Sequence, residues 1–189
     1  MDQSRKLLDL GGKCHENIKR AQGLERLTNL LRLELNGNNL TKIEGLESLT
    51  NLEDLFFDGN NIAEIEGLDA QVNLTRLDLG SNKIAEIKNL DKLINLNILD
   101  LSINKITEIK GLDKLVNLRI LGLGRNQITD VKPLAKLRSL ETIFLTGNPL
   151  TDIDPLKKLP NLKELYIRYS QVPQHSLLEF KEARERAWT

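Results

Sequence analysis

The chain contains few of the residue types that most often build disulfide frameworks, metal centres and active sites. Its 189 residues include one cysteine, two histidines, one tryptophan and one methionine. The single cysteine, Cys14, excludes an internal disulfide and fits a reducing compartment. Lys and Arg number 27, as do Asp and Glu, so the net charge is zero. This balance argues against a general electrostatic binder of nucleic acid, which needs clustered basic residues.

Long apolar runs and catalytic motifs are also missing from the sequence. No apolar stretch approaches the ~18 residues that indicate a membrane span, and the N-terminus lacks the apolar region of a secretory signal. His15 and His175 lie near opposite ends of the chain, too far apart for one site. The sequence therefore predicts a cytoplasmic, monomeric protein that is not an enzyme. We expect no cofactor, no metal, no nucleic acid and no membrane partner.

Leucine and asparagine are abundant and recur with one period. There are 39 Leu and 18 Asn residues. One asparagine returns every 22 residues without a slip, as Asn38, Asn60, Asn82, Asn104, Asn126 and Asn148. Apolar columns keep the same phase, for example Leu33/Leu35, Leu55/Phe57, Leu77/Leu79, Leu99/Leu101 and Leu121/Leu123. Such regularity indicates an array of structural repeats.

The period has a direct physical explanation. An L-x-L step places both leucines on one side of a short strand and the residue between them on the other. One 22-residue unit cannot bury its leucines alone, so neighbouring units must stack into a continuous core. The backbone groups that turn inward after the strand need partners. An Asn amide both donates and accepts, so the periodic asparagines are predicted to form a ladder between successive turns.

These residues match the pattern L-x-x-L-x-L-x-x-N-x-L, and the sequence resembles the leucine-rich repeat family over residues 24–172. The resemblance implies an α/β-type repeat solenoid, a right-handed superhelix with a curved parallel sheet on its concave face. A 22-residue period leaves little room on the convex side, where we expect 3₁₀ turns or irregular coil. Pro133, Pro155 and Pro160 lie in that return segment, where a long helix would not tolerate them.

The two ends of the array are predicted to be caps, because an open stack exposes its core. Residues 1–23 form an N-terminal cap whose Leu8-Asp9-Leu10 segment is a degenerate first strand. Ser170 stands where the ladder asparagine is expected, so the repeats end near residue 172. Residues 173–189 are predicted to form a capping helix, with Ser176 and Glu179 as a capping box at its start.

The outward strand positions are the candidate binding surface, since solenoids generally bind through their concave face. Exposed aromatic and apolar residues ringed by charge are typical of binding hot spots. We predict partner contacts at Phe56, Asp58, Asp78, Ile98, Asp100, Ile120, Arg125, Phe144, Tyr166 and Arg168. As surface residues, Phe56 and Tyr166 should tolerate truncation with little loss of stability. Gly122 and Gly124 should leave a shallow dip for a partner side chain.

Two subclasses of the family share features with this chain. Ile62-Ala-Glu-Ile-Glu-Gly-Leu68 looks like the intracellular 22-residue class typified by the regulatory subunit of type-1 protein phosphatase, whose members hold partner proteins. Ile128-Thr-Asp-Val-Lys-Pro-Leu134 is similar to the internalins, bacterial adhesins that grip host receptors. The resemblance therefore implies a protein-interaction scaffold, an adaptor similar to the phosphatase regulators, with an internalin-like adhesin or effector as the alternative.

Three other interpretations of the outward residues stay open. Arg32, Asp54 and Arg76 could form a solvated ladder of charge with no partner. The carboxylates of Asp58, Asp78 and Asp100 could bind a metal, although oxygen-only sites usually come from one loop with closer ligands. The array could also be purely structural or engineered.

Overall fold

A computed structural model describes residues 6–12 and 23–187 as a stack of coils, each carrying one short strand. The strands form one 8-stranded sheet in the order of the chain. They are β1 (Leu7–Asp9), β2 (Arg32–Glu34), β3 (Asp54–Phe56), β4 (Arg76–Asp78), β5 (Ile98–Asp100), β6 (Ile120–Gly122), β7 (Thr142–Phe144) and β8 (Glu164–Tyr166). Two 3₁₀ helices, η2 (Lys132–Lys136) and η3 (Asp154–Lys158), and the helix α1 (Gln174–Ala187) complete the described elements.

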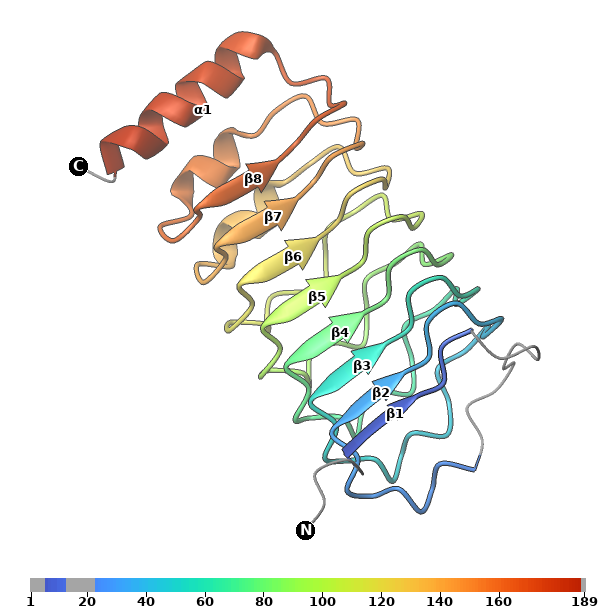
Figure 1. Ribbon diagram of the computed structural model, residues 1–189. Coiled ribbons are helices and arrows are strands. Elements are labelled where there is room, and N and C mark those ends of the chain that lie inside the picture. The colour runs from blue at the N-terminus through green and yellow to red at the C-terminus, as the bar shows by residue number, and fades with distance from the viewer. Residues whose placement is uncertain (1–5, 13–22, 188–189) are drawn as a thin grey trace.

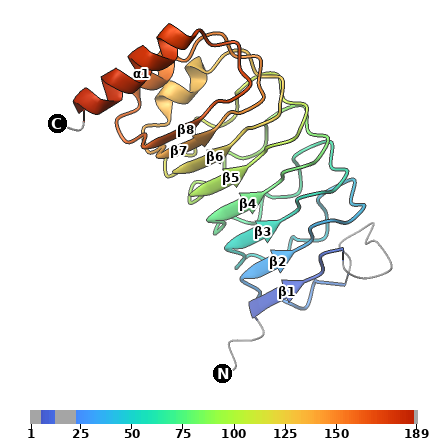
Figure 2. The ribbon, with the colours of Figure 1, turned by 45° about the horizontal axis from the view of Figure 1, so that its top comes forward.

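Every strand pairs in parallel with the next one in the chain, so equivalent residues of the repeats face each other (Figure 1). Leu33 lies opposite Leu55, and Leu55 lies opposite Leu77. The degenerate first strand is also present, with Leu8 opposite Leu33. Figure 2 shows the coils fanning out on the side away from the sheet, so the sheet lies on the inner, concave side of the arc. The predicted repeat solenoid is confirmed.

The core is one column of apolar side chains that runs through the described coils. It extends from Leu24 to Val172, and the strand leucines such as Leu99 and Leu101 have no exposed surface. Each leucine packs on its equivalents in the coils before and after it, which is why no single coil is stable alone. Removing one such side chain, as in Leu99→Ala, costs ~2–5 kcal/mol in a core of this kind.

The periodic asparagine amides bridge successive coils. Asn60 Nδ2 donates to the carbonyl of Leu35 in the preceding coil and to that of Phe57 in its own, both at 2.9 Å. Its Oδ1 accepts from the backbone N–H of Leu40 at 3.0 Å. Equivalent bonds recur at Asn82, Asn104, Asn126 and Asn148. The amide therefore supplies both partners that the inward-turning backbone needs.

The convex side consists of tight turns and short 3₁₀ helices, as the 22-residue period predicts. In the turn of the second repeat, the backbone N–H of Leu49 donates to the carbonyl of Leu46 at 2.9 Å. Later coils tighten into η2 and η3, each with a proline in its first turn, Pro133 and Pro155. Proline fits there because its missing N–H has no partner at the start of a helix.

The C-terminal helix covers the last coil, but its start differs from the prediction. Helix α1 begins at Gln174, and the N–H of Leu177 donates to the carbonyl of Pro173 at 3.2 Å. Ser176 therefore lies inside the first turn, and the capping box predicted at Ser176 and Glu179 is wrong. Leu177 and Phe180 pack against the core. Among the described residues, no helix has the length and apolar character needed to cross a membrane.

The predicted N-terminal cap falls only in part on described residues. Cys14 and His15 lie outside them, as does Trp188 near the other end. The described part of the cap, residues 6–12, continues the pattern of the array. Asn38 Nδ2 donates to the carbonyl of Leu10 at 2.8 Å, so the ladder reaches back to the first coil.

One polar side chain interrupts the apolar column of the convex turns. Gln71 occupies the position that Leu49 and Leu93 fill in the neighbouring coils, and it is fully buried. Its Nε2 donates to the carbonyl of Leu46 at 2.7 Å, whereas its Oε1 has no hydrogen-bond partner within the described residues. A buried acceptor without a partner lowers the stability of the folded chain.

Replacing this side chain by the repeat's usual residue should stabilise the protein. We expect Gln71→Leu to raise the free energy of unfolding by about 1–2 kcal/mol, because it removes the unsatisfied oxygen and fills the same space with apolar atoms. The carbonyl of Leu46 keeps its bond from Leu49. Urea unfolding of both proteins measures the change. The exposed Gln127→Leu serves as the control and should change stability by less than about 0.5 kcal/mol; a less stable Gln71→Leu would contradict this account.

Candidate functional site

The concave face consists of the outward side chains of β2–β8 and of the loop residues that follow each strand. The sequence-predicted residues all lie on it, but in separate groups. Asp58 lies in the loop after β3, Asp78 is the last residue of β4, and Asp100 is the last residue of β5. Ile98 and Ile120 lie opposite each other in the middle of the sheet, and both are half-buried. Phe144, Tyr166 and Arg168 belong to the last two coils, whereas Phe56 lies in β3 and Arg125 follows β6.

Phe56 is not exposed, contrary to the sequence-based expectation. Its side chain is only 5% exposed, because a guanidinium lies over each side of the ring. Arg32 and Arg76 come from the neighbouring strands, with their Cζ atoms 4.5 and 4.9 Å from the ring centroid. Arg32 is also held by Glu34 at 2.8 Å and by Asp54 at 3.4 Å. This end of the face presents a compact group of paired charges, with the apolar ring beneath it.

Phe144 and Tyr166 form an exposed aromatic platform. They face each other in register on β7 and β8, and their rings stack at a centroid distance of 4.6 Å and an angle of 7°. The two residues remain 38% and 45% exposed. The tyrosine hydroxyl donates to Glu164 at 3.3 Å, which fixes the outer edge of the platform. A rigid, exposed aromatic pair offers a partner apolar area at little entropic cost.

The carboxylates of the middle coils hydrogen-bond to their own loops. Asp78 Oδ1 accepts from the N–H of Gly80 at 3.0 Å, and Asp100 Oδ1 accepts from the N–H of Ser102 at 2.8 Å. Burial raises the pKa of the Asp78 carboxyl, and the charges of Asp100 and Asp58 raise it further. Across the described residues, no group of three or more His, Cys, Asp or Glu side chains is placed to hold a metal ion.

The dip predicted at Gly122 is filled by a neighbouring side chain. A Cβ atom at this position would lie 2.7 Å from Cγ of Asp100, so the carboxylate occupies the space that the missing side chain leaves. Gly124 is closed in part by the carbonyl of Thr146, 3.3 Å from a Cβ built there. The glycine therefore makes room for Asp100, and no pocket for a partner side chain remains at Gly122.

Three exposed side chains follow the strands at a strained backbone position. Ile103, Arg125 and Tyr169 have φ values of 57°, 52° and 59°. Glycine occupies the equivalent position in other coils, for example Gly59 and Gly147. The left-handed conformation is unfavourable for residues with a Cβ and most unfavourable for β-branched isoleucine. Ile103 and Tyr169 are 46% and 88% exposed, so packing within the chain does not explain them.

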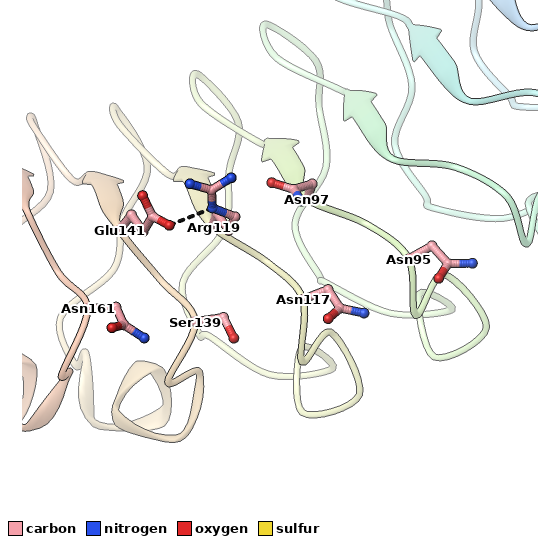
Figure 3. Close-up of a pocket in the computed structure, with 7 residues that line it drawn as sticks. All are labelled: Asn95, Asn97, Asn117, Arg119, Ser139, Glu141 and Asn161. Carbon is pink, nitrogen blue, oxygen red and sulfur yellow. Dashed lines mark hydrogen bonds and ion pairs between the residues drawn. The ribbon is translucent and has the colours of Figure 1, made fainter.

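A second asparagine ladder, which our sequence analysis missed, lines a polar recess of about 340 Å³ on the lateral side of the stack (Figure 3). Asn95 Nδ2 donates to the carbonyl of Val72 at 3.1 Å, and Asn117 Nδ2 donates to that of Ile94 at 2.9 Å. The same bond recurs at Asn51, Asn73 and Asn161, with Ser139 taking the place of asparagine once. The sequence signal for this ladder was an Asn-Leu pair that recurs every 22 residues, as in Asn95-Leu96 and Asn117-Leu118, with Ser139-Leu140 as the exception.

An ion network closes the upper side of this recess. Glu141 binds Arg119 of the preceding coil at 2.5 Å (Figure 3). It also binds Lys163 of the following coil at 2.8 Å. The hydrogen bonds from Arg119 and Lys163 lower the pKa of Glu141 to about 2. The amides and the charges of the recess are thus engaged in holding neighbouring coils together, which marks it as a structural feature.

The burial of Phe56 changes what its truncation should do. We expect Phe56→Ala to lower the free energy of unfolding by about 2–4 kcal/mol, because it removes a buried ring and its two cation–π contacts. Tyr166→Ala, at the exposed platform, should change stability by less than about 1 kcal/mol. Thermal and urea unfolding of the two variants make the comparison. Equal, small effects would show that the ring contributes no burial in solution.

The carboxyl of Asp78 should make stability depend on pH. A pKa raised in the folded state means that the folded chain binds this proton more readily than the unfolded chain, so stability falls as the pH rises through the raised pKa. We expect Asp78→Asn to be more stable than wild type by up to about 1 kcal/mol near pH 7. The difference should shrink near pH 4. Urea unfolding at both pH values tests this, with the exposed Glu47→Gln as control; a less stable Asp78→Asn near pH 7 would refute it.

Comparison with known proteins places this geometry in a family. The family model "Leucine Rich repeats (2 copies)" matches residues 17–70, 72–114, 94–136, 116–158 and 138–176. Searching the curated proteins gives no match. Internalin C2 of Listeria monocytogenes is 34% identical, with a TM-score of 0.84 over 92% of this chain and 75% of its own.

Two further solved structures have lower coverage. The internalin inlF of Listeria monocytogenes is 31% identical, with a TM-score of 0.79 over 86% of this chain and 48% of its own. A leucine-rich repeat protein of Leptospira interrogans is also 31% identical, with a TM-score of 0.76 over 84% of this chain and 42% of its own. The chain thus spans less than half the length of these two proteins. Together with the strand register and the asparagine ladder, these matches show that the chain belongs to the leucine-rich repeat family.

Proposed function

We propose that this chain is a monomeric, non-catalytic scaffold that binds a partner protein on its concave face. The observation that carries the proposal is the Phe144–Tyr166 platform, two residues whose rings stack and which stay 38% and 45% exposed. The fold does not require aromatic residues there, because the equivalent positions in β4 and β6 are Asp78 and Gly122. Exposed, well-ordered aromatic residues are the usual anchors of protein interfaces.

The dimensions of the face favour a macromolecule over a small metabolite. The half-buried isoleucines Ile98, on β5, and Ile120, on β6, lie on the strands between β4 and the platform on β7 and β8. From Asp78 to Tyr166 the sheet advances four strand spacings, ~19 Å. An interface that uses both ends therefore needs a partner with an extended segment or a broad surface.

Two versions of this proposal differ in the kind of partner. The I-x-x-I-x-G-L turns of the early repeats support an intracellular adaptor that resembles the regulatory subunit of type-1 protein phosphatase. The likeness to internalin C2, with 34% identity over 92% of the chain, supports an internalin-like adhesin or effector. The second version has the broader support, because it extends over the whole array of repeats.

Affinity capture with matched variants tests the common proposal. Wild type, Phe144→Ala/Tyr166→Ala and Ile94→Ala/Val116→Ala are immobilised, and retained proteins are quantified from source-cell and host-cell extracts. Ile94 and Val116 are exposed apolar residues outside the strands, so the third protein controls for lost apolar surface. We expect a protein that wild type and the control retain equally and the platform variant retains about tenfold less, a loss of about 1.4 kcal/mol.

The retained protein is then purified and its direct affinity measured by calorimetry. Unchanged thermal unfolding of the platform variant shows that the loss is local. Equal loss in the control variant, or no protein that distinguishes the three, would refute binding through this face.

A further inference from the structure

The charged side chains of the concave face are unevenly distributed along the stack. The half-buried Asp58, Asp78 and Asp100 form an acidic end, in which Arg76 on β4 is the one cation not already paired with a carboxylate among the described residues. Arg125 and Arg168, in the loops after β6 and β8, are exposed and form a basic end, where Glu164 on β8 accepts the hydrogen bond of Tyr166. Within the described part of the chain, Asp58, Asp78, Asp100, Arg125 and Arg168 form no ion pair. The half-buried Ile98 shares β5 with Asp100, and the half-buried Ile120, on β6, precedes Arg125, so an apolar pair lies where the two ends meet.

Charges elsewhere on the surface are arranged differently. Opposite charges in successive coils pair repeatedly, as in Lys88–Glu64 at 2.9 Å, Lys92–Asp69 at 2.9 Å, Lys110–Glu86 at 2.9 Å and Lys136–Asp113 at 3.0 Å. On the concave face itself, Arg32 pairs with Asp54. The stacking of successive coils thus repeatedly brings opposite charges together in this protein.

The acidic end breaks this arrangement at a specific pair. Asp78 and Asp100 lie directly opposite each other in the register of β4 and β5. Like charges at such positions destabilise a sheet. Arg76, the nearest cation along β4, lies over the ring of Phe56 and forms no ion pair with a described carboxylate. Arg76 acts on Asp78 only through its charge at longer range, so both carboxylates are open to a direct ion pair with a cationic side chain of a bound molecule.

The surroundings of the carboxylates favour basic side chains over a metal ion. One oxygen of Asp78 and one of Asp100 already accept backbone N–H groups. Carboxylates on neighbouring strands are ~4.8 Å apart, a spacing that one guanidinium can bridge. Ile98 and Ile120 offer apolar surface for the aliphatic stem of a lysine or an arginine.

We infer that the concave face takes an extended segment of a partner protein, with basic residues over the acidic end and acidic residues toward the basic end. This inference rests on the proposed function and adds the charge pattern and the direction of the occupant. The ~19 Å between β4 and β8 corresponds to about six residues of extended chain. A matching segment therefore carries its basic residues and the apolar residue that meets Phe144 and Tyr166 about six positions apart.

Two short peptides test the charge pattern without a known partner. The ¹⁵N-labelled protein is titrated at low ionic strength with acetylated, amidated tetra-arginine and, separately, with tetra-glutamate. We expect tetra-arginine to shift the backbone amides of β3–β5, and tetra-glutamate those of β6–β8 and their following loops. Added salt should weaken both, because the contacts lie at the surface.

Paired variants serve as controls for one another. Asp78→Asn/Asp100→Asn should weaken tetra-arginine at least about fivefold and leave tetra-glutamate within about twofold. Arg125→Gln/Arg168→Gln should do the reverse. Glu47→Gln/Asp91→Asn also removes two negative charges, but from exposed positions outside the strands, and should change the binding of neither peptide. All substitutions are close in shape to the original side chains, and thermal unfolding checks that each variant folds.

Several results would overturn the inference. They are binding of both peptides at the same strands, no binding of either, or equal weakening by Glu47→Gln/Asp91→Asn. Shifts at β3–β5 that appear with calcium or magnesium at lower concentration than with tetra-arginine would identify a metal site instead.

A captured partner separates this inference from the proposed function. If a protein depends on Phe144 and Tyr166 but binds equally well to Asp78→Asn/Asp100→Asn, the charge pattern fails and the function stands. If no protein depends on the platform, the proposed function fails, and the peptide titrations still decide the chemistry of the face.

Discussion

Stacking is the constraint on which the rest of this structure depends, because no coil can bury its inward leucines without neighbours on both sides. The asparagine amides make that stacking specific. Each amide satisfies an inward-turning N–H and carbonyl groups of two coils, so successive coils lie at one spacing and in one register. A fixed register turns the sequence into columns, in which residues 22 positions apart become direct neighbours.

The chemistry of the concave face follows from this register. It puts Arg32 beside Asp54, Asp78 opposite Asp100, and the ring of Phe144 on that of Tyr166. One sheet therefore contains an ion pair, a pair of opposed like charges and a pair of stacked rings. The residues that differ between repeats, rather than the repeated residues, therefore determine which partner binds.

The period alone was sufficient to predict the strands, the first ladder and the convex 3₁₀ turns, since each depends on backbone geometry that repeats. The second ladder was available from the same period and was missed because its asparagines lie outside the leucine pattern. The burial of Phe56 and the filling of the space at Gly122 were not predictable in this way. Both depend on where neighbouring long or charged side chains lie, on Arg32 and Arg76 in one case and on Asp100 in the other.

The pairing and burial of side chains limit the part of the concave face that a partner can contact. At β2 and β3, Arg32 pairs with Glu34 and Asp54, and Phe56 is covered, so the side chains of this region are already paired or buried within the chain. From β4 onward, the face carries the opposed carboxylates of Asp78 and Asp100. It also carries left-handed residues other than glycine at the position that Gly37, Gly59 and Gly147 occupy in other coils, namely Ser81, Ile103, Arg125 and Tyr169. Neither feature is needed for stacking, and both oppose folding. Both features are found from β4 onward, which indicates that this part of the face is shaped by a requirement other than the stability of the chain.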